Sequence, residues 1–170
     1  NSFRFKTPAM PLVLERLPAT IELAFFAIII SILIAIPAGV LSAIYQNSLL
    51  DYIVTIVSTI GRAMPNFWIG IMLILLFSVF YKFLPVSGRL EASSFILPAV
   101  TLGTSIATTL ARILRSSMLE VIRKEYVITA YSKGLSKFNV IKNHILRNSL
   151  IAITTVFGLQ FAWILGGSVI

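Results

Sequence analysis

Charged residues are scarce in this sequence. Only 12% of its 170 residues are Asp, Glu, Lys or Arg, and only six are acidic, whereas 58% are hydrophobic and the mean hydropathy is +0.96. Soluble domains carry about 25% charged residues, because a folded chain needs polar side chains to cover its surface. The composition therefore excludes a water-soluble enzyme and a disordered chain, and it indicates an integral membrane protein.

Cysteine is absent, and histidine occurs once, at His144. The lack of cysteine excludes disulfides and thiolate metal sites. Since no cluster of carboxylates accompanies His144, we expect neither a metal site nor a cofactor. The sequence has no phosphate-binding loop of the form GxxxxGK[ST], so a P-loop ATPase is excluded. No Ser/His pair, paired acids or metal constellation lies in the apolar runs, which disfavours an intramembrane enzyme.

Four charge-free runs of 19 to 28 residues are present, at 23–50, 63–81, 92–111 and 148–170. About 20 apolar residues cross a bilayer as one helix. We therefore expect an all-α, polytopic membrane helix bundle with spans at about 21–45, 52–81, 96–118 and 149–170. The second span is long for one crossing, and Gly61 with Pro65 should bend or break it.

The basic residues are unevenly distributed along the chain. Segment 112–147 holds eight Lys and Arg against two Glu, whereas the segments predicted on the other side of the membrane hold five. Those five are Arg4, Lys6, Arg16, Lys82 and Arg89. Because cytoplasmic loops are enriched in Lys and Arg, segment 112–147 is predicted to be cytoplasmic. Residues 1–19 and the turn predicted at 84–91 are then external.

Small residues recur every fourth position in three of the predicted spans. They are Ala35, Gly39 and Ala43; Ala99, Gly103, Ala107 and Ala111; and Gly158, Ala162 and Gly166. Such rows let helix backbones approach closely where hydrophobicity supplies no drive for association. We expect these helices to pack against protein, within one bundle in preference to a dedicated dimer motif.

The segment 119–148 has the pattern of two amphipathic helices joined by a tight turn. Gly134 suits the end of the first helix, and Ser136 suits the start of the second. The apolar residues at helical spacing are Leu119, Ile122, Tyr126 and Ala130 before the turn, and Phe138, Ile141 and Ile145 after it. From the residues alone, this basic segment could bind nucleic acid, lie on anionic lipid or dock on a cytoplasmic partner.

Residues 125–135, EYVITAYSKGL, followed by HILRN at 144–148, resemble the cytoplasmic EAA loop of ABC-transporter permeases. The similarity is closest to the dipeptide/oligopeptide/nickel branch. At three positions the sequence departs from the general EAA pattern but fits this branch: Thr129, His144 and Arg147. The segments ERLPAT (15–20), PNFWIG (65–70) and RSSMLE (115–120) resemble other parts of the same family. The resemblance thus covers nearly the whole chain.

The resemblance implies a permease subunit of a type I ABC importer in the prokaryotic cytoplasmic (inner) membrane. Such subunits have six spans, so we expect a further span beyond each end of this chain. The implied partners are a second permease subunit, two cytoplasmic ATP-binding subunits and an external binding protein that delivers peptides or nickel. Membrane lipid surrounds the chain, nucleic acid is not a partner, and the chain itself is not an enzyme. The residues assigned to ATPase coupling are Glu125, Tyr126, Thr129, Ala130, Lys133, Gly134 and Leu135.

Arg62 is the only charge well inside a predicted span. Such an arginine either lines a transport path or donates hydrogen bonds to backbone carbonyls that lose their helical partners at the break near Pro65. Asn66 and Gln160 are further candidates for the path, although both also suit hydrogen bonds between helices. The rival functional interpretation is a passive channel or secondary transporter, in which the basic loop only sets the orientation.

Overall fold

The computed structural model describes residues 9–85 and 92–167, and within these ranges the chain is helical apart from turns. The elements are α1 (Ala9–Ile44), α2 (Leu49–Ala63), α3 (Asn66–Ile74), the π-helix η1 (Leu75–Phe80), the 3₁₀-helix η2 (Ala92–Phe95), α4 (Ile96–Ile122), α5 (Glu125–Ser132), α6 (Lys137–Asn139), the π-helix η3 (Val140–Leu146) and α7 (Arg147–Gly167). The predicted all-α fold is confirmed.

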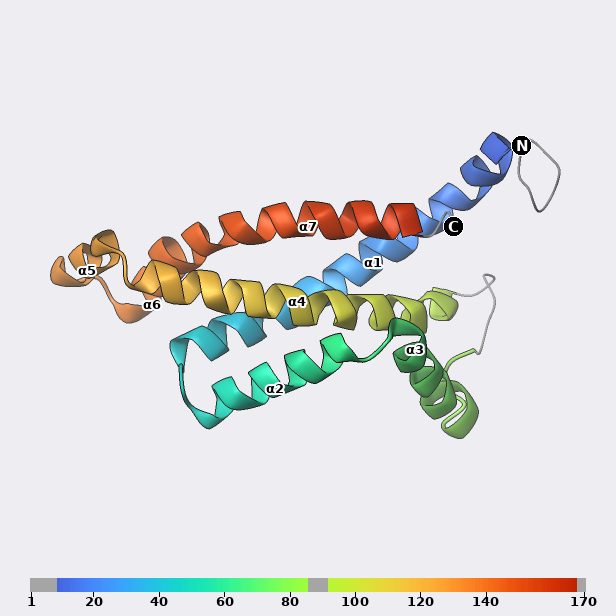
Figure 1. The fold of residues 1–170 in the computed structure, drawn as a ribbon, viewed down its shortest axis with the longest axis horizontal. Coiled ribbons are helices and arrows are strands. Elements are labelled where there is room, and N and C mark those ends of the chain that lie inside the picture. Colours follow the sequence, from blue (N-terminus) through green and yellow to red (C-terminus); the bar gives the residue numbers. More distant parts are fainter. Residues whose placement is uncertain (1–8, 86–91, 168–170) are drawn as a thin grey trace.

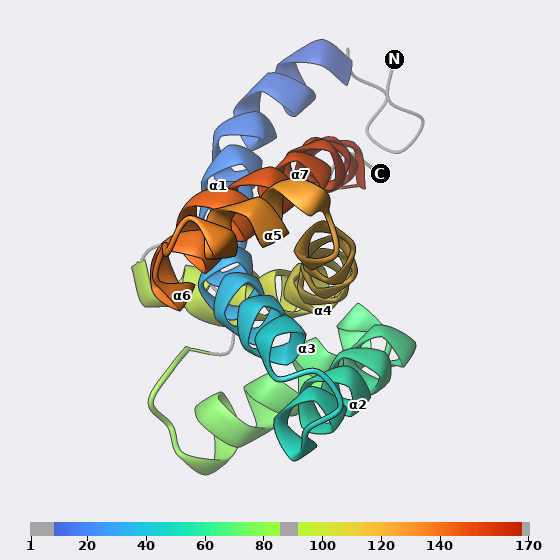
Figure 2. The same cartoon turned by 90° about the vertical axis from the view of Figure 1, so that its left-hand side faces the viewer.

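Three long helices form the body of the molecule. Figure 1 shows α1, α4 and α7 running along the long axis, with α2 on the opposite side of α4 from α7, and Figure 2 shows the same order from the end. Among the described residues, three stretches are long and apolar enough to cross a membrane, Leu14–Ile44, Ser93–Ile122 and Lys137–Ile164. The pair α2 and α3–η1 qualifies only when its two parts are taken together.

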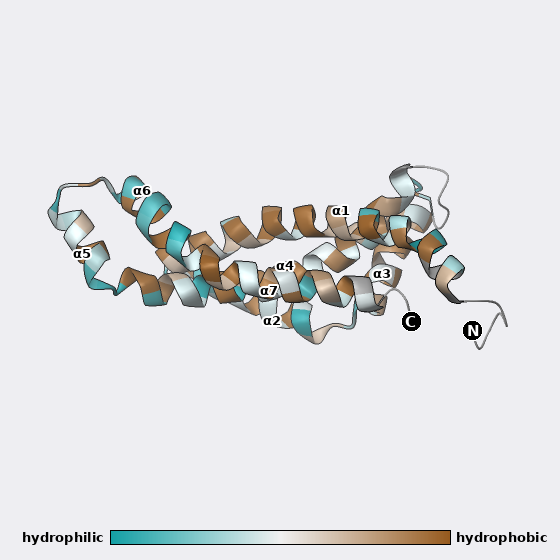
Figure 3. Cartoon of the chain, turned by 90° about the horizontal axis from the view of Figure 1, so that it is seen from above, coloured by the Kyte–Doolittle hydropathy of each residue, from teal (hydrophilic) through white to brown (hydrophobic). Residues whose placement is uncertain are grey.

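Polar residues gather at one end of this bundle. Figure 3 shows hydrophilic residues on α5, α6 and the adjoining helix ends, while the middle of the long helices is mostly hydrophobic. The α1–α2 turn faces this same end, and α3, the start of α4 and the end of α7 lie toward the other end (Figure 1). Along the chain, α1 and α4 therefore run toward this polar end, whereas α2 and α7 run away from it.

The closest packing joins α1 to α4, because glycines remove the side chains between them. A Cβ built on Gly39 would lie 2.8 Å from the Ala111 carbonyl oxygen, and one built on Gly103 would lie 2.8 Å from the Ala27 carbonyl oxygen. Real Cβ atoms do not approach backbone this closely, so both positions require glycine. The expectation that the small rows of the first and third spans pack on protein is confirmed.

The small row of α7 behaves differently. A Cβ built on Gly158 or Gly166 would meet nothing within 4 Å among the described residues. Instead α7 uses another face, on which Ile153 and Ile164 are buried against the bundle. Helix α7 thus packs on α4 and α1 as expected, but among the described residues bulky apolar side chains make its contacts, and the row at Gly158, Ala162 and Gly166 is exposed.

The predicted break in the second span is confirmed, and it is sharp. The axes of α2 and α3–η1 differ by 99°. Met64 is extended (φ −82°, ψ 130°), as a residue before proline prefers, and Pro65 begins the next helix at φ −64°. Gly61 and Gly70, on either side of the break, face the Thr108 and Thr101 methyl groups of α4. The broken segment thus stays in contact with α4 along both of its parts.

Two helix ends differ from the sequence prediction. Helix α1 is described from Ala9, whereas the first span is predicted to start at about residue 21, and the helix continues through Pro18. Its first turns extend beyond the bundle (Figure 1). Helix α4 continues past the predicted residue 118 to Ile122. Most of the predicted turn at 84–91 and the last residues of the predicted fourth span lie outside the described residues.

Candidate functional site

Helix α5 ends in a turn that favours glycine. Gly134 has φ +82°, its N–H donates to the Tyr131 carbonyl at 2.9 Å, and the Leu135 N–H donates to the Ala130 carbonyl at 3.3 Å. These two bonds are the paired bonds of a Schellman motif, which satisfies the last carbonyls of a helix. Ser136 then caps α6, accepting a hydrogen bond from the Asn139 N–H at 3.4 Å. The predicted helix end at Gly134 and the predicted helix start at Ser136 are both confirmed.

The inner side of α5 attaches the loop to the membrane bundle. Val127 and Ala130 are buried, and they belong to the same hydrophobic cluster as Met118 of α4 and Val140 and Ile145 of η3. An apolar face on the inner side of a short helix holds it in place, because an isolated helix of this length is unstable in water. Within the described residues, α5 therefore packs mainly on η3, which continues into α7.

The single apolar face predicted across 119–130 is wrong in one respect. The chain leaves helical geometry at Arg123 and Lys124, so α4 and α5 are separate helices with different directions. As a consequence Tyr126, predicted on the apolar face with Ala130, is 44% exposed, and Val127 takes the inward position. Residues at helical spacing share a face only within one continuous helix. The sequence has no proline or glycine at the end of α4, so it does not signal this break.

The outer side of α5 and the turn presents exposed apolar side chains next to basic ones. We call it the loop surface, and it consists of Tyr126, Ile128, Tyr131, Leu135 and Phe138. The ammonium group of Lys142 lies 6.0 Å from the ring centre of Phe138, whose side chain is among the most exposed. Several exposed large apolar side chains on one short segment make it a candidate surface for binding another molecule.

The seven residues predicted for coupling fall into two groups. Glu125, Tyr126, Thr129, Lys133, Gly134 and Leu135 are exposed on or beside the loop surface. Ala130 is only 4% exposed and lies in the buried cluster. Ala130 therefore touches this chain's own bundle, and a bulkier residue there would displace α5.

A buried ion pair close to the loop was not predicted from the sequence. The Asp51 carboxylate is 3% exposed and accepts two hydrogen bonds from Arg115, Nε to Oδ1 and an Nη to Oδ2, both at 2.7 Å. Ser42 also donates to Oδ1, and the Asn47 N–H donates to Oδ2 at 2.9 Å. One side chain thus joins α1, the α1–α2 turn, α2 and α4. The available signal was that Asp51 and Arg115 lie at the same end of neighbouring predicted spans.

The three predicted path residues do not converge. Arg62 is exposed at the end of α2, and Asn66 is half-buried at the start of α3, so these two flank the break at Pro65. Gln160 is half-buried on α7. Because α7 lies on the other side of α4 from α2 and α3 (Figures 1 and 2), Gln160 is remote from the other two within this chain.

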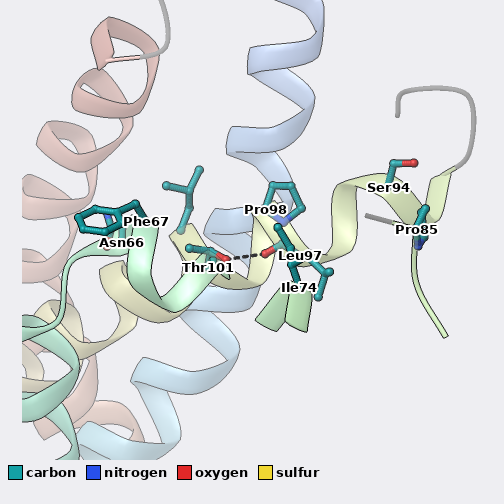
Figure 4. Close-up of a pocket in the computed structure, with 10 residues that line it drawn as sticks. Asn66, Phe67, Ile74, Pro85, Ser94, Leu97, Pro98 and Thr101 are labelled. Carbon is teal, nitrogen blue, oxygen red and sulfur yellow. Dashed lines mark hydrogen bonds between the residues drawn. The ribbon is translucent and has the colours of Figure 1, made fainter. Parts of the chain in front are cut away.

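A cavity of about 520 Å³ lies beside the break, between α3 and the first turns of α4 (Figure 4). It is lined by Asn66, Phe67, Gly70, Ile74, Pro85, Ser94, Leu97, Pro98, Thr101 and Leu102. Its walls are mostly apolar, with an amide and two hydroxyl groups among them. Within residues 9–85 and 92–167, no group of three or more His, Cys, Asp or Glu is placed to hold a metal ion.

The sequence matches one protein family over most of its length. The profile of the family described as "Binding-protein-dependent transport system inner membrane component" matches residues 35–170. The di/tripeptide transport system permease protein DppB of Pseudomonas aeruginosa is 42% identical, over 90% of this chain and 54% of that protein. The oligopeptide transport system permease protein AppB of Bacillus subtilis is 40% identical, over 96% of this chain and 55% of that protein. The dipeptide transport system permease protein DppB of Escherichia coli is 34% identical, over 99% of this chain and 59% of that protein. The chain thus spans a little over half the length of these relatives.

Proposed function

This chain belongs to the family of binding-protein-dependent transport system inner membrane components, and from that premise we propose that it is a permease subunit of an ATP-driven importer of short peptides. The relatives are named for di-, tri- and oligopeptide transport, which favours peptides over nickel as cargo. ATP hydrolysis takes place in separate cytoplasmic subunits, because this chain has no P-loop. A second permease subunit completes the pathway, and an external binding protein delivers the peptide.

The loop surface is where we place the contact with an ATPase subunit. It combines exposed apolar side chains with the basic residues Lys133, Lys137 and Lys142, at the polar end of the bundle (Figure 3). The inner side of α5 packs against η3, and η3 in turn contacts α4 and continues into α7. A displacement of α5 by the ATPase is therefore passed through η3 to these two membrane helices.

The transport path in this proposal runs along the broken segment. Arg62 and Asn66 lie at a point where the backbone leaves helical geometry, and irregular backbone inside a membrane occurs where it faces protein or a wet cavity. Gln160 contributes to the path only from another side of the bundle. A passive channel, the rival interpretation, would require neither the loop surface nor an ATPase.

The turn at Gly134 provides the test. In Gly134→Val a β-branched residue must adopt φ +82°, at a cost of about 1–2 kcal/mol or more, whereas asparagine tolerates this region. We expect Gly134→Val to insert normally, since residue 134 lies outside the long apolar helices, yet to retain little ATPase. Gly134→Asn, the matched control, should retain most of it.

The measurement is co-purification of the ATPase with the assembled permease, together with ATP-driven peptide uptake into vesicles. Both should fall together in Gly134→Val. ATPase association and uptake equal to wild type in Gly134→Val would contradict the role of the loop, and peptide uptake by the wild type without ATP would favour the channel.

A further inference from the structure

The cavity beside the break has two walls that are regular helix faces. Asn66, Gly70 and Ile74 recur every four residues along α3, and Leu97 and Thr101 do so along α4 (Figure 4). Its volume of about 520 Å³ lies within the range of roughly 300–1,000 Å³ in which proteins hold small ligands. None of its ten lining residues is charged. The walls therefore suit an apolar group, and a charged group would lose its hydration there without compensation.

Gly70 keeps this cavity open. A Cβ built on Gly70 would lie 3.6 Å from the Thr101 methyl group, which is ordinary contact distance. The backbone therefore does not require glycine at this position, in contrast to Gly39 and Gly103 in the α1–α4 contact. Any larger side chain at residue 70 would extend into the space between α3 and α4 and fill it.

Two polar side chains that line the cavity, Asn66 and Ser94, make no hydrogen bond within the described part of the chain. Thr101 donates its hydroxyl hydrogen to the Leu97 carbonyl at 2.8 Å, so it can only accept from a ligand. The side-chain amide of Asn66 makes no hydrogen bond within the described part of the chain, although it is half-buried among apolar residues. An amide offers donors and an acceptor together, and a peptide bond offers the complementary pair.

The position of the cavity suits arriving cargo. It lies near the start of α4, toward the end of the bundle that is opposite α5 and the loop surface (Figure 1). In the proposed orientation this is the external half of the membrane. It also adjoins the break at Pro65, where the chain turns by 99° between α2 and α3.

We propose that this cavity is a subsite for an apolar side chain of the transported peptide, with Asn66 pairing to the adjoining peptide bond and Gly70 setting the size limit. The proposal rests on the proposed function, since it presupposes peptide cargo. Gly70 is then a specificity-determining residue. Charged side chains and the charged peptide ends stay outside the cavity.

The test compares two competing peptides, trialanine and trileucine, in vesicles that contain the assembled transporter. In Gly70→Leu the uptake of trileucine should fall at least about tenfold relative to trialanine, the effect of excluding a side chain from an apolar pocket. Gly70→Ala, the matched control, should keep the wild-type ratio. Asn66→Leu should lower uptake of both peptides. An unchanged ratio in assembled Gly70→Leu, or an equal fall for both peptides, would overturn the proposal.

A second measurement covers the case in which Gly70→Leu does not assemble. Because the chain has no cysteine, Thr101→Cys introduces a single thiol into the cavity wall. Trileucine should protect this thiol from a maleimide reagent, and trilysine should not. Equal labelling with and without trileucine would overturn the subsite and leave water or lipid as the occupant. Failure of the proposed function has a different signature, because the wild type would then import neither peptide.

Discussion

Asp51 is a charge that the fold buries completely and pairs completely. A carboxylate has about four acceptor positions, and here two are used by Arg115, one by Ser42 and one by the Asn47 N–H. Ser48 in turn accepts from the Asp51 N–H at 3.3 Å, which fixes the first turn of α2. The pair therefore specifies how the α1–α2 hairpin sits on α4, seven residues before the end of that helix.

Removing one member of this pair should be costly. In Arg115→Ala the Asp51 carboxylate stays buried without its main partner, and such a change destabilises proteins by about 3–5 kcal/mol. The control is Glu120→Gln, which breaks the exposed pair with Lys124 at 3.5 Å and should cost no more than about 1 kcal/mol. Thermal unfolding of the purified protein measures both. Equal midpoints for the two variants would mean that the buried pair contributes nothing to stability.

At the scale of elements, the contact between α2 and α4 depends on a glycine facing a threonine. A Cβ on Gly61 would lie 2.8 Å from the Thr108 methyl carbon, and threonine has little freedom to rotate that methyl away in a helix. Gly61→Ala should therefore destabilise the protein by about 1–3 kcal/mol. Thr108→Ser removes the methyl group, so Gly61→Ala/Thr108→Ser should recover most of the loss in a thermal unfolding experiment. A double variant no more stable than Gly61→Ala would show that α2 is displaced for another reason.

At the scale of the whole molecule, the basic residues are concentrated at one of the two ends of the helix bundle. Eight Lys and Arg lie in 112–147, which includes α5, α6 and η3. Lys82 follows η1, which continues α3, and α3 lies toward the opposite end of the bundle in Figure 1. The positive-inside rule therefore predicts that α5 faces the cytoplasm and Lys82 the outside.

Single cysteines can test this orientation, because the chain itself has none. A membrane-impermeant maleimide added to intact cells should label Lys82→Cys and should label Lys137→Cys only after the membrane is opened. Both side chains are exposed in the structure, so access through the membrane decides the result. Labelling of both positions in intact cells would contradict the arrangement of the long helices across the membrane.

The sequence by itself determined the membrane class, the long helices, the break at Pro65 and the glycine turn at residue 134. Each of these depends on local chemistry: the length of an apolar run, a proline without an N–H, or a residue that tolerates positive φ. The family resemblance was equally readable, because it resides in short segments of consecutive residues.

Tertiary structure alone decided which faces meet. The rows of small residues on α1, α4 and α7 read alike, yet only those of α1 and α4 are packed together. The pairing of Asp51 with Arg115, residues 64 positions apart, and the cavity between α3 and α4 also follow from the bundle's arrangement. Helical spacing shows which residues share a face, but the partner of that face is fixed by the packing of the whole bundle, where the energy of each contact depends on its neighbours.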